Sequence, residues 1–150
     1  MDLKSGDIAQ KEFDRAQQEL DRNNVLAALA CLERALSIRD DPFWHSRLGF
    51  CIAKQRGHLT RAFELCNSAI EHDPGNSLHY LYLGKVYLVA GNKFEALQSF
   101  RNGMRLGGSP ELEEVLDVIG ARKPPVITFV SRDNILNKYL GIILGRFGFR

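Results

Sequence analysis

The sequence lacks the motifs by which common enzymes are recognised. It has no G-x-S-x-G nucleophile motif, no glycine-rich phosphate loop and no H-E-x-x-H metal motif. It also offers no identifiable pair of carboxylates in an apolar setting, and its polar residues fit helix surfaces, caps and turns. We therefore predict that the chain is not an enzyme and that it binds no cofactor.

Cysteine is scarce, and its arrangement excludes the usual cysteine-based sites. The chain has three cysteines, Cys31, Cys51 and Cys66, an odd number that includes no C-x-x-C pair. All three fall within helical patterns, so we expect reduced thiols that are buried as small apolar side chains. A metal site shared with neighbouring histidines would match no zinc spacing and would need ligands from several helices. No metal is predicted.

Long hydrophobic runs and an excess of one charge are also absent. The N-terminal stretch has no apolar core of signal-peptide length, and no run approaches the ~20 apolar residues that span a bilayer. The formal net charge of +2 is too small to indicate a nucleic-acid partner. The chain has 150 residues, of which 45% are hydrophobic and 25% charged, as in an ordinary globular protein. We predict one domain of a cytoplasmic protein.

The clearest pattern that is present lies between residues 73 and 108, where two amphipathic helices flank a turn at 90–92. The apolar stripe of the first helix has the spacing i, i+3, i+4 and i+7, at Tyr80, Leu83, Gly84 and Tyr87. The stripe of the second helix is made of Ala96, Phe100 and Gly103. Glycine inside a helix costs about 1 kcal/mol relative to alanine, so we expect Gly84 to permit close approach of a second backbone.

The same pattern recurs upstream at a fixed offset. Ala28, Ala62 and Ala96 are separated by 62 − 28 = 34 and 96 − 62 = 34 residues. Two further columns follow these alanines: Leu32, Cys66 and Phe100, and then Ala35, Ala69 and Gly103. A turn column holds residue types that tolerate positive φ, namely Asn23, Gly57 and Gly91. The chain thereby resembles the tetratricopeptide repeat (TPR) family, whose period is about 34 residues.

The resemblance implies an all-α fold, a right-handed α-solenoid of three helix-turn-helix units closed by a capping helix. It places the TPR domain at residues 8–121, with units at about 8–40, 41–74 and 75–108 and the capping helix at 110–120. The match is strongest in the third unit and weakest in the first. Ser109 is expected to cap the last helix, with Pro110 as its first residue.

Three side chains near the starts of the second and third units have predicted roles. Trp44, the single tryptophan, is expected to be a packing anchor between neighbouring repeats rather than a ligand contact. His45 and His79 are expected to be partly exposed polar residues without a catalytic role.

The C-terminal tail, residues 122–150, departs from the repeat pattern. Pro124 and Pro125 enforce extended backbone, and a β-branched stretch follows them. A short helix is expected near the end, with an apolar face that must be covered. The tail could pack on its own array, exchange with a second copy to make a homodimer, or lie on a membrane surface.

The resemblance also implies a function, because the inner groove of TPR proteins is lined mainly by the first helix of each repeat and holds another polypeptide. The candidate groove residues are Phe50, Lys54, Leu81, Lys85, Leu88, Glu113 and Asp117. Phe50, Leu81 and Leu88 would grip an apolar peptide side chain, while Lys85 would bind a carbonyl or carboxylate. An alternative interpretation is that this face is solvated or covered by the chain itself. The predicted function is a non-enzymatic adaptor or scaffold for protein–protein interaction; the alternative is an oligomerisation or assembly scaffold that acts through its tail.

One specialisation of the family can be examined directly. Members that bind chaperones use lysine, arginine and asparagine side chains to clamp the terminal carboxylate of a peptide. The corresponding inner positions of the third unit carry Leu78 and Tyr82. The full clamp is therefore absent, and Lys85 alone would have to recognise a carboxylate.

Overall fold

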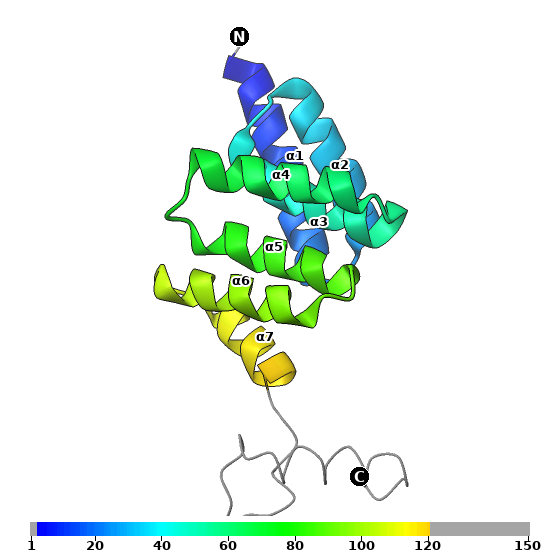
Figure 1. Ribbon diagram of the computed structural model, residues 1–150. Helices are drawn as coiled ribbons and strands as arrows, with labels where there is room; N and C mark the ends of the chain where they lie inside the picture. Colours follow the sequence, from blue (N-terminus) through cyan, green and yellow to red (C-terminus); the bar gives the residue numbers. More distant parts are fainter. Residues whose placement is uncertain (1–2, 121–150) are drawn as a thin grey trace, which may run out of the picture. The chain divides into compact units, whose positions relative to one another are not determined.

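The computed structural model describes residues 3–120, and in this part of the chain all regular secondary structure is α-helical (Figure 1). Its helices are α1 (Leu3–Asp21), α2 (Val25–Ile38), α3 (Pro42–Arg56), α4 (Leu59–His72), α5 (Ser77–Val89), α6 (Lys93–Arg105) and α7 (Pro110–Gly120). Within these residues, no helix has the length and hydropathy needed to cross a membrane. The predicted all-α class is confirmed. The predictions for the tail fall on residues outside the described part.

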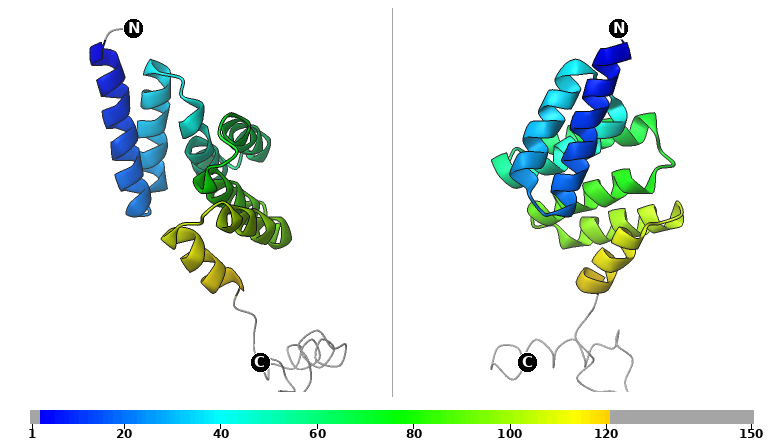
Figure 2. Two further views of the ribbon diagram at one scale, coloured as in Figure 1. Left: turned by 90° about the vertical axis from the view of Figure 1, so that its left-hand side faces the viewer. Right: turned by 180° about the vertical axis from the view of Figure 1, so that it is seen from behind.

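The helices are arranged as consecutive pairs. α1 packs on α2, α3 on α4 and α5 on α6, and successive pairs meet through contacts of α2 with α3, α3 with α5 and α4 with α5. Figure 2 shows these pairs following one another from α1 toward α7. Each pair leaves an apolar flank that the next pair covers, as expected for an α-solenoid. α1 begins at Leu3, five residues before the predicted start of the first unit at about residue 8.

Short polar turns separate the helices and stop them at defined residues. Asn23, Gly57 and Gly91 have φ values of 59°, 69° and 79°, so the predicted turn column is confirmed as three left-handed positions. Asn24, Asp41, Asn76 and Asn92 then cap the following helices by accepting a hydrogen bond from a backbone amide. Ser109 does the same for α7, because its Oγ accepts from the amide of Leu112 at 3.2 Å.

The core is built from the small residues that recur with the repeat. Ala28, Ala62 and Ala96 are all fully buried, and so are Leu32, Cys66 and Phe100 in the next column. Equivalent sequence positions therefore have equivalent surroundings in the three pairs. The three cysteines are buried free thiols, as predicted, and burial raises the pKa of Cys51 and Cys66 to about 12.

Glycines in the helices mark the closest approaches between neighbouring elements. A Cβ atom at Gly49 would lie 2.7 Å from the carbonyl oxygen of Ala62, so α3 and α4 touch backbone to backbone there. At Gly84 the expectation of a second backbone is wrong, because the neighbouring group is the ring of Phe100, which a Cβ atom would overlap. The aromatic ring of α6 takes the space that the missing side chain leaves on α5.

Candidate functional site

A cleft of about 400 Å³ lies where residues of α1, α3 and α5 meet the start of α7. Its lining comes from the end of α1, the turn after it, the start of α2, the first helices α3 and α5, and the start of α7: Leu20, Asp21, Asn23, Val25, Phe50, Tyr82, Lys85, Pro110, Glu111 and Glu114. We call this set of residues the cleft. Residues from the first helix of all three pairs thus meet α7 at one hollow, and its volume falls in the range of small ligand sites, roughly 300–1,000 Å³.

Two rings form the aromatic floor of the cleft. The centroids of Phe50 on α3 and Tyr82 on α5 are 5.9 Å apart, with an angle of 42° between the ring planes. The ammonium group of Lys85 lies 5.4 Å from the Phe50 centroid and 5.1 Å from the Tyr82 centroid. The same ammonium forms an ion pair with Oε1 of Glu111 at 2.5 Å. The charge of Lys85 is therefore already balanced within the protein.

A buried arginine contacts one ring of the floor without lining the cleft. Arg47 on α3 is only 5% exposed, and its guanidinium lies 5.2 Å from the ring centroids of both Phe13 and Tyr82. Its Nε donates a hydrogen bond to Oε1 of Gln17 at 2.8 Å. Burial raises the pKa of Tyr82 to about 12, although the charge of Arg47 acts in the opposite direction. The three first helices are thus joined beneath the floor by one guanidinium, which is not part of the cleft lining.

Two carboxylates form the acidic rim of the cleft, Asp21 at the end of α1 and Glu114 on α7. Both residues are exposed. Oδ1 of Asp21 accepts a hydrogen bond from Nε2 of Gln17 at 3.2 Å, which leaves its charge without a cationic partner in residues 3–120. The side chain of Glu114 has no hydrogen-bond or ion-pair partner within the same residues. In the described part of the chain, the rim therefore presents two carboxylates that are not paired with a cation.

The structure distributes the predicted groove residues over several surroundings. Phe50 and Lys85 line the cleft together. Leu81 is fully buried in α5 and belongs to the interior, while Leu88 is half-buried and Lys54 is exposed, both outside the cleft lining. Consecutive residues of a helix lie on different faces. Leu81 and Tyr82 are adjacent in α5, but only Tyr82 is on the face that lines the cleft.

The capping helix turns a different face to the cleft from the one predicted. Glu113 and Asp117 are exposed and do not line it, whereas Glu111 and Glu114 do. Acidic residues surround much of α7, so the sequence pattern alone does not indicate which of them face inward. Arg47 is not among the predicted residues, although it shares a helix face with Phe43 and Phe50 at spacings of four and three residues.

His79 was expected to be partly exposed, and the structure corrects this expectation. It is fully buried between α3 and α5, where its Nδ1 forms a hydrogen bond with Oγ of Ser46 at 2.9 Å. Its Nε2 has no hydrogen-bond partner among the described residues, and Oδ2 of Asp73 lies 4.0 Å away. Burial, and then the nearby charge of Arg47, lower the pKa of His79, while Asp73 opposes them.

This histidine should make stability depend on pH. In the unfolded chain a histidine protonates near its ordinary pKa of about 6.5, whereas folded His79 protonates at lower pH. Its contribution to stability is complete above about pH 6.5 and is lost as pH falls toward the lowered folded pKa, because the unfolded state then binds more protons. The urea concentration at the unfolding midpoint should decrease as the pH is lowered from 7.5 to 5. In His79→Asn this decrease should be smaller. The control His58→Asn, at an exposed position, should leave the fall unchanged; equal pH slopes for wild type and His79→Asn would contradict the prediction.

Comparisons with known proteins agree on the fold. Residues 65–98 match a family model described as a tetratricopeptide repeat. This segment runs from the second half of α4 through α5 into α6. Its length is one repeat period, but it begins in the middle of a second helix rather than at the start of a helix pair. No curated protein sequence matches the chain.

Several solved structures have a similar fold. An O-GlcNAc transferase mutant from Thermobaculum terrenum gives a TM-score of 0.64 at 21% identity, covering 79% of this chain and 23% of that one. The first TPR of Spaghetti (RPAP3), bound to the HSP90 peptide SRMEEVD, gives a TM-score of 0.56 at 14% identity, and the match covers 77% of this chain and 92% of that one. The second TPR domain of human RPAP3, in complex with the HSP70 peptide SGPTIEEVD, gives a TM-score of 0.55 at 20% identity, and the match covers 79% of this chain and 99% of that one. The chain thus spans less than a quarter of the transferase, and most of the length of the two RPAP3 domains.

Proposed function

Taking as premise that the chain is a tetratricopeptide repeat protein, we propose that it is a non-enzymatic adaptor that binds a segment of another polypeptide in the cleft. The observation that carries this proposal is the lining of the cleft, to which the first helix of every pair and α7 contribute. Such a surface exists only when the pairs are stacked, so binding would be a property of the array. The three free cysteines favour a reducing compartment, and we propose a cytoplasmic location.

The shape and chemistry of the cleft support a peptide rather than a small polar metabolite. Its floor offers the partly exposed ring of Phe50, supported by Tyr82, which is only 2% exposed. Leu20 and Pro110 add apolar surface at its sides. Aromatic floors with a polar rim are typical of sites that anchor one or two side chains of an extended segment. Phe50 is half-buried and Tyr82 is buried, so both rings are held in place by their neighbours. A rigid surface of this kind loses less conformational entropy when a peptide binds.

The peptides bound by the two RPAP3 domains are useful probes because both end in the acidic sequence EEVD. In this chain the predicted carboxylate-binding lysine, Lys85, is paired with Glu111, and two further carboxylates line the cleft. We propose that this chain does not bind such acidic ends. The partner would differ from the chaperone peptides of its structural neighbours.

The proposed function can be tested with a display library of random peptides selected on the full chain. We expect a selected peptide to lose at least about fivefold in affinity when Phe50→Leu removes ring contact from the floor, since a central aromatic contact is worth about 1 kcal/mol or more. The matched control is Phe94→Leu, because Phe94 is 67% exposed on α6 and is not part of the cleft. Failure to select any peptide, or binding that depends on Phe94 and not on Phe50, would overturn the proposal.

A further inference from the structure

We propose that the cleft recognises a cationic segment, an extended stretch of a partner protein that presents a lysine or arginine beside an apolar side chain. This inference rests on the proposed function of the cleft and adds the chemistry of its ligand. It follows from three observations: the balance of charge around the cleft, the state of its own cations, and the groups that form the aromatic floor.

The titratable residues that line the cleft are mostly acidic. Asp21, Glu111 and Glu114 contribute three negative charges, and Lys85 contributes one positive charge, so the lining carries a net charge of 1 − 3 = −2. The carboxylates come from two elements that both line the hollow, α1 and α7. A ligand in the cleft would meet negative charge from both elements, which favours a cation and repels an anion.

Within residues 3–120, the two cations that contact the rings of the floor are Lys85 and Arg47, and neither is free to reverse this preference. Lys85 is held against two rings and paired with Glu111, and its side chain is only 22% exposed. The guanidinium of Arg47 contacts the Tyr82 ring, but Arg47 is 5% exposed and does not line the cleft. An acidic ligand would have to break the pair of Lys85 with Glu111 and displace the unpaired carboxylates from its path.

The aromatic floor already accommodates a cation. The ammonium of Lys85 rests near the ring centroids of Phe50 and Tyr82 while a carboxylate balances its charge. The ring faces attract positive charge through their quadrupole, and an apolar chain such as the stem of lysine or arginine packs well on them. A ligand side chain with an aliphatic stem and a charged end could place the stem against the part of the Phe50 ring that remains exposed, and the end at Asp21 or Glu114.

The inference is tested by deep sequencing of the same random peptide library after selection on three versions of the full chain. The first is wild type, the second is Glu114→Lys and the third is Glu113→Lys. The two variants change the net charge equally and alter adjacent exposed residues of α7, but only Glu114 lines the cleft. We expect peptides enriched in lysine and arginine for wild type and for Glu113→Lys, and loss of that enrichment for Glu114→Lys.

Affinities of one enriched basic peptide then give the size of the effect. Reversing the charge of an exposed partner should weaken binding about tenfold in Glu114→Lys and less than about threefold in Glu113→Lys. Enriched peptides that depend on Phe50 but are neutral or acidic would overturn this inference and leave the proposed function intact. Equal losses in both variants would also overturn it, and failure to enrich any peptide would count against both proposals.

Discussion

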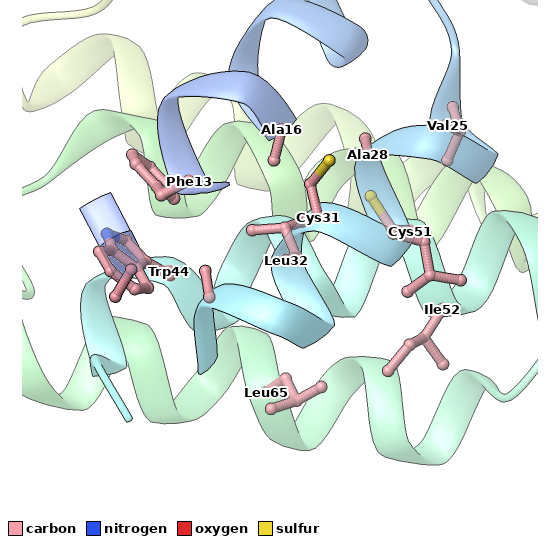
Figure 3. Packing of buried hydrophobic residues seen from close by; sticks show 13 residues of the cluster. Phe13, Ala16, Val25, Ala28, Cys31, Leu32, Trp44, Cys51, Ile52 and Leu65 are labelled. Atoms are coloured by element: carbon pink, nitrogen blue, oxygen red, sulfur yellow. The ribbon is translucent and has the colours of Figure 1, made fainter. Parts of the chain in front are cut away.

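Replacing Trp44 with alanine should lower the free energy of unfolding by about 3–5 kcal/mol, the usual cost of removing a buried tryptophan. Trp44 is 2% exposed, and its ring stacks on Phe13 of α1 with centroids 4.8 Å apart and planes 11° apart. The guanidinium of Arg39 also lies 4.4 Å from the ring centroid of Trp44. Figure 3 shows the two rings in one buried cluster with Ala16, Ala28, Cys31 and Cys51. This tryptophan therefore joins the first helix pair to the second, as the sequence predicted.

The effect of Trp44→Ala should be unevenly distributed along the chain. In a repeat array each pair contacts only its neighbours, so the loss of one junction weakens the terminal pair most. Hydrogen exchange should accelerate in α1 and α2 more than in α5 and α6, and urea unfolding should become broader. Trp44→Phe, which keeps an aromatic ring against Phe13, should cost markedly less. A uniform increase in exchange across all six paired helices would contradict the role of Trp44 as a junction.

Replacing Gly84 with alanine should destabilise the protein by about 2 kcal/mol, although alanine is the better helix former. The intrinsic gain is about 1 kcal/mol, whereas overpacking a core costs about 1–3 kcal/mol or more. The steric term should dominate, because the added Cβ atom would overlap the ring of Phe100 and that ring is fully buried. The two helices α5 and α6 would have to separate. Thermal and urea unfolding measure the change.

Two further variants identify the cause. Gly6→Ala is the matched control, since Gly6 is also helical and a Cβ atom there would meet nothing within 4 Å; it should be neutral or slightly stabilising. Combining Gly84→Ala with Phe100→Leu should cost at least about 1 kcal/mol less than the sum of the single changes, because the smaller side chain relieves the overlap. Additive losses in this cycle would show that contact between these two residues is not the reason for the glycine.

The sequence predicted the parts of the fold that repeat. Ala28, Ala62 and Ala96 recur in register because equivalent small residues are needed wherever two helices of a pair approach closely, and all three are buried as expected. The turn positions follow the same logic, since only a few residue types adopt a left-handed backbone without strain. Constraints of this kind can be recognised in a single sequence because each repeat needs the same residue types at equivalent positions.

The sequence did not predict how the helices turn their faces at the site. Leu81 and Tyr82 are both apolar neighbours in α5, which is hydrophobic on nearly every side, so its pattern cannot separate the interior from the cleft. α7 presents the converse difficulty, with acidic residues on several faces. The burial of His79 depends on Ser46, which lies 33 residues away and supplies its hydrogen bond. Each of these features is set by contacts between units rather than by the repeat itself.

The most direct test of the account is a chemical-shift map of the full chain titrated with a peptide selected from the library. We predict that the largest changes fall on residues of the cleft, Leu20, Phe50, Tyr82 and Glu114, with little change at Leu26 and Phe94, which are 65% and 67% exposed outside it. Changes centred on Leu26 or Phe94, with the cleft resonances unmoved, would contradict the claim that the stacked first helices and α7 form the binding surface.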